Sequence, residues 1–223
     1  MLRKKASFDI FIAMNIIPQL IVNSIVAGAI YSLVSLGFNL IYSTAKFLDL
    51  GYGVLTAVGG YAVFYFSRTL GFNIYLSIVL GVLVAGFVGY LIEKIVYKKL
   101  RARKASSMVF MVAALGVMTT LQAIIAILFS SQFQVFPATT STQTFQILGG
   151  VITGVQLIAL ALSIVIMFVL VLTLRFTKFG KAIKAVSDDA EVAKMVGINT
   201  DGIISKVFFI GSCIAGLAGI LVG

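Results

Sequence analysis

Few residues of this chain could take part in chemistry. The 223 residues include seven Asp and Glu, no His and a single Cys, Cys213, which lies inside an apolar run. These counts exclude a His-based triad, a His proton relay, a Cys/His zinc site and a disulfide within the chain. We therefore expect no catalytic, cofactor-binding or metal-binding residue, and we interpret Cys213 as a small packing residue.

Three of the seven acids, Asp188, Asp189 and Glu191, lie close together in the sequence. Asp188 and Asp189, with Ser187, are candidates for the N-cap of a helix, and Asp188 and Glu191 have the spacing of a capping box. Gly197 is a natural residue for the turn that ends such a helix. The pattern predicts a short helix over 189–196.

The helix predicted over 189–196 would carry an apolar face, because Val192, Met195 and Val196 follow the spacing i, i+3, i+4. So short a helix is unstable alone in water and needs a surface to lie on. It could dock onto a cytosolic partner protein or onto the inner face of its own bundle, or lie in the membrane interface as an amphipathic helix. The residues alone leave these alternatives open.

Polar residues inside the apolar runs form a second group. Asn23 and Asn39 lie in the first run, and Gln122 lies in the fourth. Amide side chains in hydrocarbon need hydrogen-bond partners, so we expect them to face the bundle interior or a solute pathway. Hydrogen bonding between helices, without any pathway, would also explain them.

The segment 46–53 contributes three further candidates for the pathway, Asp49, Gly51 and Gly53. Asp49 is a candidate N-cap for the helix that follows, and the two glycines permit unusual backbone angles. A half-helix that starts at membrane depth would aim its positive end at the pathway, whereas an ordinary loop is the alternative. Asp49 and Glu93 lie at the ends of apolar runs, where we expect water to reach them.

The elements that must hold these residues are membrane helices. Hydrophobic residues make up 61% of the chain and charged residues 11%, whereas soluble domains average about 45–50% apolar and about 25% charged residues. This composition excludes a soluble enzyme and a disordered chain, and it predicts an all-α polytopic membrane bundle. Apolar runs fall at 10–41, 53–66, 74–92, 108–129, 151–174 and 203–223. The second run is short for a full span, which predicts a broken or re-entrant segment.

The excess of 17 Lys and Arg over seven acids, a net charge of +10, is concentrated in two loops. Six basic residues lie within 93–104 and six within 175–206, but none within 130–150. The positive-inside rule places the first two stretches in the cytoplasm and the third outside, so the charge indicates orientation rather than nucleic-acid binding. Basic residues at 3–5 also favour the inside, which requires an even number of crossings before Glu93. One of the three runs would then dip in and return, and 53–66 is the candidate. The alternative places the N-terminus outside.

Stripes of small residues spaced by four indicate close packing between helices. They are formed by Ser24, Gly28 and Ser32, by Gly81, Ala85 and Gly89, and by Ala215, Gly219 and Gly223.

The acidic cluster also carries a family resemblance. The tract 180–199, G-K-A-I-K-A-V-S-D-D-A-E-V-A-K-M-V-G-I-N, is similar to the cytoplasmic motif of the LivH-like permease family, membrane subunits of bacterial ABC transporters for branched-chain amino acids. The stretches 211–223 and 24–42 resemble, respectively, the start of the family's next span and its first helix. The resemblance covers roughly residues 18–223.

The resemblance implies a single transmembrane permease domain over 1–223, with 175–204 as a cytoplasmic coupling loop, in the bacterial plasma (inner) membrane. The residues that would seat in a cytosolic ATP-binding subunit are Asp188, Asp189, Glu191, Val192, Met195, Val196 and Gly197. A second permease subunit and an external solute-binding protein would complete the importer in the lipid bilayer. The permease would hydrolyse no ATP itself, in agreement with a sequence that contains no G-x-x-x-x-G-K-[ST] loop.

The chain departs from the family pattern in two ways. The family usually has N-F-A-H-G-D before its second helix, and the stretch 47–53 has no His. Branched-chain or other hydrophobic amino acids are the expected substrates, with urea, amides and simple sugars as alternatives. Family members are also longer, so we expect the chain to be incomplete at its C-terminus. The rival classes are a self-contained carrier or channel, which the lack of a mid-span carboxylate disfavours, and a membrane scaffold.

Overall fold

The computed structural model describes the backbone of residues 2–129, 144–147 and 150–222, and the side chains of 17–129 and 151–222. The stretch 130–150, expected outside, therefore lies mostly outside the described residues. The side chains of the basic residues at 3–5 lie outside them as well.

The described chain is a bundle of long helices with one small hairpin. Its elements are α1 (Leu2–Ala45), α2 (Tyr52–Phe64), η1 (Tyr65–Thr69), α3 (Ile74–Ile92), η2 (Glu93–Tyr97), α4 (Lys98–Ala102), α5 (Ser107–Phe129), β1 (Thr144–Ile147), β2 (Gly150–Thr153), α6 (Gly154–Phe176), α7 (Lys178–Asp188), α8 (Ala190–Met195) and α9 (Thr200–Val222). Within the described residues, five segments are long and apolar enough to cross a membrane: Ile17–Ala45, Ile74–Ala102, Ser107–Phe129, Gly154–Phe176 and Thr200–Val222. The predicted all-α polytopic membrane bundle is thus confirmed.

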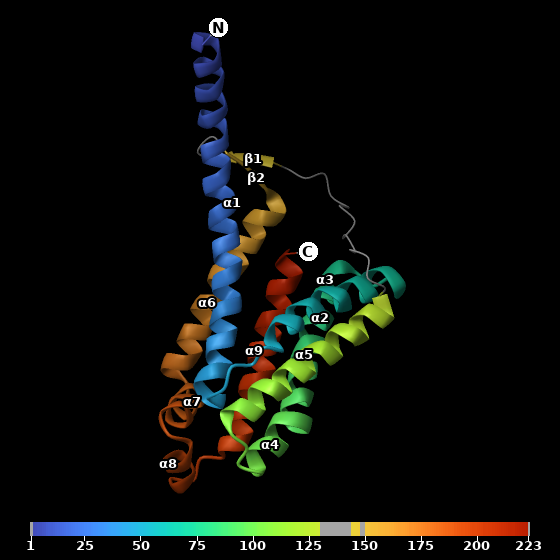
Figure 1. Ribbon diagram of the computed structural model, residues 1–223, viewed down its shortest axis with the longest axis vertical. Helices are drawn as coiled ribbons and strands as arrows, with labels where there is room; N and C mark the ends of the chain where they lie inside the picture. Colours follow the sequence, from blue (N-terminus) through green and yellow to red (C-terminus); the bar gives the residue numbers. More distant parts are fainter. Residues whose placement is uncertain (1, 130–143, 148–149, 223) are drawn as a thin grey trace.

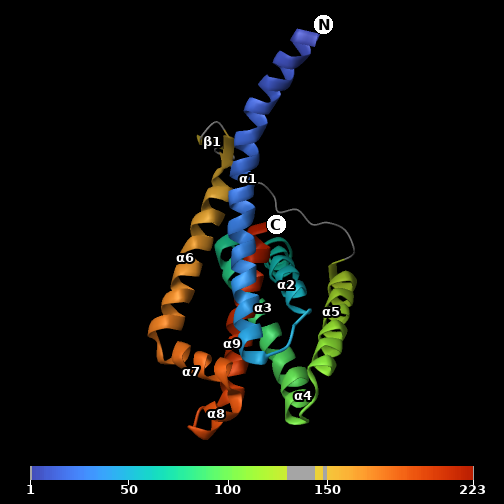
Figure 2. The same cartoon turned by 60° about the vertical axis from the view of Figure 1, so that its left-hand side comes forward.

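Helix α9 is the element on which α1, α2 and α3 pack (Figures 1 and 2). Gly216 lies so close to the neighbouring helices that a Cβ there would be 2.4 Å from the Cβ of Ala85 on α3 and 3.5 Å from the Cα of Gly59 on α2. On the other flank, a Cβ on Gly211 would be 2.7 Å from the side chain of Ile41 on α1. Small residues therefore let four helix backbones meet without a layer of large side chains between them.

The stripe predicted on α3 lies in this interface. Gly81 faces Val63 of α2, and Gly89 faces Ser212 of α9. The stripe predicted on α1 lies elsewhere, because a Cβ on Gly28 would have no described atom within 4 Å. The third stripe, on α9, ends outside the described residues.

Helix α2 is separated from α1 by a break in the helical structure, and it does not dip in and return. It follows the non-helical stretch 46–51, which includes the buried residues Phe47 and Asp49. The contacts of Gly81 with Val63 and of Gly89 with Leu55 make α2 antiparallel to α3. Glycine contacts of the same kind make α1 and α3 both antiparallel to α9. With the loop before α9 in the cytoplasm, α1 therefore runs inward and α2 runs back out, which favours the alternative with the N-terminus outside.

The hairpin was not expected from the sequence, which assigned residues 151–153 to a helical run. β1 and β2 pair antiparallel, with Thr144 opposite Thr153. The Gln19 side chain of α1 holds β2 from the other side, accepting from the Val151 N–H at 2.8 Å and donating to the Val151 carbonyl at 3.0 Å. Thr153 and Gln156 then form a capping box that starts α6.

Helix α7 was also missed by the sequence analysis. Its buried face, Gly180, Ile183 and Val186, packs against α1, α6 and α9, while lysines occupy the exposed face. A Cβ on Gly180 would collide with the Leu174 carbonyl of α6, so glycine allows the sharp turn between the two helices. The helix lies across the end of the bundle and carries α8 at its tip (Figure 2).

The glycine packing around α9 generates a direct test. We expect Gly216→Ala to lower the free energy of unfolding by about 1–3 kcal/mol, because the new methyl group has no room against Ala85. Gly28→Ala is the matched control and should leave the free energy of unfolding unchanged or raise it by up to about 1 kcal/mol, because alanine has the higher helix propensity and its methyl group meets no described atom. Unfolding midpoints in one detergent would measure both. Equal midpoints for the two variants would contradict this account of the core.

Candidate functional site

The acidic cluster forms the short helix predicted for it. Asp189 is the N-cap of α8, and its Oδ1 accepts from the backbone N–H groups of Glu191 at 2.8 Å and Val192 at 3.0 Å. Asp188 is instead the last residue of α7, so the predicted capping box of Asp188 and Glu191 is wrong by one residue. The cap forms one position later because the chain leaves the helical conformation at Asp189.

The end of α8 also agrees with the sequence. Gly197 has a φ of +86°, and its N–H donates to the Lys194 carbonyl at 3.1 Å. The Ile198 N–H donates to the Ala193 carbonyl at 3.0 Å. These two bonds are a Schellman motif, which fixes the direction in which the chain leaves α8 toward α9.

The apolar face of α8 is divided between the bundle and the solvent. Ala193 is buried. Val192, Met195 and Val196 have 54%, 82% and 72% of their surface exposed. An exposed apolar patch on a capped helix at the tip of a loop marks an interaction site more often than it marks core. We call these three side chains the α8 patch.

The first turn of α9 connects the chain just after α8 to α4 and η2, at the cytoplasmic end of the span Ile74–Ala102. Asp201 Oδ1 accepts from Arg101 Nε at 3.0 Å, and Arg101 Nη2 reaches Glu93 Oε1 at 2.6 Å. The other Glu93 oxygen accepts from the Ser205 hydroxyl. Three elements, α4, η2 and α9, are therefore joined by one network, although residue 93 and residue 205 are far apart in the sequence.

Glu93 lies in the interior, not at a wet end of its helix. Its exposed fraction is 0% and that of Asp49 is 3%, so the expectation that water reaches both carboxyl groups is wrong. A carboxylate without water needs compensation from charge and hydrogen bonds. Arg101 and Ser205 supply it for Glu93, which makes this acid the electrostatic centre of the cytoplasmic end.

The π-helical turn η2, which carries Glu93, makes a second polar contact through Tyr97. Tyr97, the last residue of η2, donates its hydroxyl proton to Asp49 Oδ1 at 2.8 Å, and the Gly51 N–H donates to the same oxygen at 3.0 Å. Burial raises the pKa of the Asp49 carboxyl, and the two hydrogen bonds oppose this shift. The wide π-turn directs both Glu93 and Tyr97 into the bundle, and such turns often occur at functional positions.

An aromatic cluster surrounds the Tyr97 ring and fixes the segment before α2. The Phe47 ring centroid lies 4.8 Å from that of Tyr97 and 4.7 Å from that of Phe110 on α5. Phe208 of α9 lies 5.4 Å from Tyr97. The segment before α2 is thereby tied to η2, α5 and α9 at one place.

The remaining predicted pathway residues do not converge on this place. Asn23 lies exposed toward the hairpin end of α1, where Gln19 donates to its side-chain oxygen. Asn39 lines a cavity of about 240 Å³ near the cytoplasmic end, between α1, α6 and α7. Gln122 is exposed on α5, and Gly53 is exposed on α2. Only Asp49 and Gly51 meet, where the Gly51 N–H donates to Asp49 Oδ1. The N-cap of α2 is Gly51 and carries no side-chain cap, so the N-cap expected at Asp49 is wrong by two residues.

Sequence reasoning missed the network of Glu93, Arg101, Asp201 and Ser205. Arg101 was counted as one of six cations that orient the loop, and nothing local distinguishes it from its neighbours. The only signal was the acid at the end of an apolar run, which was interpreted as accessible to water. Partners contributed by another helix cannot be inferred from the run itself.

Comparison with known proteins places the chain among membrane permeases. A family described as "Branched-chain amino acid transport system / permease component" matches residues 20–223. The high-affinity branched-chain amino acid transport system permease protein LivH of Salmonella typhimurium is 25% identical over 92% of this chain and 70% of its own length. Protein BraD of Pseudomonas aeruginosa is 24% identical over the same shares. A probable LivH of Methanocaldococcus jannaschii is 27% identical over 88% of this chain and 63% of its own. No solved structure matches the chain significantly.

The buried ion pair generates a prediction about stability. Arg101→Gln leaves Glu93 without its charge partner, so we expect the free energy of unfolding to fall by about 3–5 kcal/mol. Glu93→Gln should cost less, and the double variant should recover part of the loss through a coupling energy of about 0.5–3 kcal/mol. Lys98→Gln, on the same helix and exposed, is the control. Denaturant titration in detergent measures all four, and additive effects would argue against a coupled pair.

Proposed function

Because the chain belongs to the family of branched-chain amino acid transport permease components, we propose that it is the membrane-spanning subunit of an ATP-driven importer for branched-chain amino acids. The chain is a transport subunit rather than an enzyme, and a multi-pass membrane protein. In the proposed assembly it lies in the bacterial inner membrane. A second permease subunit, two cytosolic ATP-binding subunits and an external solute-binding protein accompany it.

The α8 patch is the observation that carries this proposal. It combines three exposed apolar side chains with a helix that is capped at both ends and held at the end of the molecule. A helix too short to persist alone is here fixed by its caps and by buried Ala193, so it is pre-organised for a partner. We assign Val192, Met195 and Val196 to contact with the ATP-binding subunit, and Asp189, Glu191 and Gly197 to shaping the helix that presents them.

The polar networks supply a route by which movement of α8 would reach the membrane. A displacement of α8 acts on the first turn of α9, since residues 196–199 alone separate them. Asp201 passes the displacement to Arg101 and Glu93, and η2 connects Glu93 to Tyr97 and Asp49. The start of α2 would therefore respond to ATP-driven closure of the partner subunits, and alternating access would follow from rigid helices moving as a group.

The substrate assignment rests on the relatives. Their names specify high-affinity branched-chain amino acid transport. In this chain, the candidate pathway residues remain Asn23, Asn39, Asp49, Gly51, Gly53 and Gln122. The missing His in the segment 47–53 keeps urea, amides and simple sugars as alternatives. A self-contained carrier is disfavoured, because the two acids buried among the described side chains, Asp49 and Glu93, lie near the cytoplasmic end with partners from this chain rather than at mid-span.

Docking through the α8 patch predicts a specific loss. Met195→Asp places a charge where an apolar contact is proposed, so we expect the ATP-binding subunit that co-purifies with the tagged chain to fall by about tenfold or more. Because Met195 is 82% exposed, the free energy of unfolding should change by no more than about 0.5 kcal/mol. Met195→Leu is the matched control and should retain the partner. Unchanged co-purification by Met195→Asp would refute docking at this face.

The substrate class has a separate test. The chain in its complete transport system, in cells that lack their own uptake systems, should accumulate labelled leucine but not labelled urea or ribose. Accumulation should stop when ATP is depleted and survive collapse of the ion gradients. Uptake that follows the ion gradient instead would identify a secondary carrier, and uptake of urea or ribose alone would overturn the amino-acid assignment while leaving the ATP-driven mechanism intact.

A further inference from the structure

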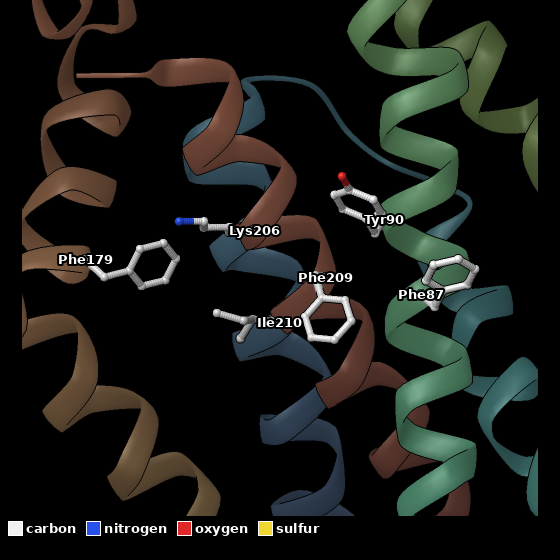
Figure 3. A pocket seen from close by; sticks show the side chains of 6 residues that line it. All are labelled: Phe87, Tyr90, Phe179, Lys206, Phe209 and Ile210. Carbon is white, nitrogen blue, oxygen red and sulfur yellow. The ribbon is translucent and has the colours of Figure 1, made fainter. Parts of the chain in front are cut away.

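A groove of about 690 Å³ opens between α3, α9 and α7 on the surface of the bundle. Phe87 and Tyr90 line it from α3, Lys206, Phe209 and Ile210 line it from α9, and Phe179 lines it from α7 (Figure 3). The walls are aromatic and aliphatic, and Lys206 is the only charged residue among the six. None of the proposed contacts with other subunits uses this groove.

The groove is ordered along the membrane normal. Helix α3 runs toward the cytoplasm and α9 runs away from it, so Tyr90 and Lys206 are nearer to the cytoplasmic end than Phe87 and Ile210. Lys94 lies one turn beyond Tyr90, with its Nζ 5.7 Å from the centroid of that ring. With the cytoplasmic ends of both helices at the membrane surface, the two cations would lie near the lipid headgroups and the apolar walls deeper, beside the acyl chains.

The two lysines have no anionic partner in the described part of the chain. The ion pairs there are those of Arg101 with Glu93 and Asp201. Lys94 and Lys206 are both exposed. A purely apolar occupant would cover the apolar walls but leave the two lysine charges uncompensated. A phospholipid would cover the walls with its acyl chains and pair the lysines with its phosphate.

We propose that this groove binds an anionic phospholipid of the cytoplasmic leaflet, with its phosphate held by Lys206 and Lys94 and an acyl chain lying along Phe87, Phe209 and Ile210. Basic pockets between membrane helices on the cytoplasmic side bind such headgroups in other proteins. The lipid would contact α3, α9 and α7 together, and α7 is the part of the coupling loop that leads to α8. This site is independent of the substrate and of the partner subunits.

The absence of Trp from the whole chain makes the site directly observable. Phe87→Trp puts the single tryptophan of the chain in the groove, at a position where Phe is 55% exposed, and this tryptophan can be excited selectively over the tyrosines. The purified chain is reconstituted in phosphatidylcholine vesicles that contain one part in five of acyl-brominated phosphatidylglycerol or acyl-brominated phosphatidylcholine. Phe168→Trp on α6, 63% exposed and away from the groove, is the matched control.

We expect brominated phosphatidylglycerol to quench the Phe87→Trp variant more strongly than brominated phosphatidylcholine does. The two brominated lipids should quench the Phe168→Trp variant to the same extent. Each lysine near the headgroups should contribute a preference of about fivefold. Adding Lys206→Gln to Phe87→Trp should remove about that much, and adding Lys94→Gln should remove the rest. Lys181→Gln, an exposed lysine of α7 outside the groove, should leave the preference unchanged.

A salt titration tests the site without further substitution. Raising the ionic strength should reduce quenching by phosphatidylglycerol and leave quenching by phosphatidylcholine constant, because only the headgroup contact is ionic. Equal quenching by the two lipids, or equal losses from Lys206→Gln and Lys181→Gln, would overturn the proposal. So would the absence of quenching by either lipid, which would mean that protein covers the groove.

Discussion

The cytoplasmic end of this bundle is organised around one buried carboxylate, Glu93. With no exposed surface, it must take its compensation from the chain itself. Arg101 provides the charge from α4, and Ser205 provides a hydroxyl from α9. Asp201 holds the same guanidinium from the other side, so the first turn of α9 has a fixed position relative to the span Ile74–Ala102.

Close glycine packing fixes the relative positions of the same helices farther along the membrane. Helix α9 touches α1, α2 and α3 through Gly211 and Gly216, and contacts at backbone distance leave little room for one helix to slide alone. The polar network fixes the cytoplasmic end and the glycines fix the middle. Helices held in these two ways move as a group, which suits a subunit whose proposed task is to change shape when a motor at one end closes.

The parts of the structure that depend on local chemistry could be predicted from the sequence. Hydropathy located the five spans, and Asp189 with Gly197 located α8, because a cap bonds residues two or three positions away. The parts that depend on distant partners could not. Glu93 was expected in water because its partner Ser205 lies on another helix, and the hairpin was missed because Gln19 holds it from α1. Helix α7 was overlooked because its lysines conceal a buried apolar face.

The position of α9 has a consequence for how the protein is made. Ribosomes produce the chain from its N-terminus, so α1, α2 and α3 reach the bilayer while the helix that joins them is still to be synthesised. Gly216 follows its neighbours Gly59 and Ala85 by more than a hundred residues. Until α9 arrives, Glu93 lacks Ser205, and the earlier helices lack the surface that orders them. Helix α2 can pack on α3 before α9 is made, whereas the contacts that join α1 to α2 and α3 through α9 form only after α9 is inserted.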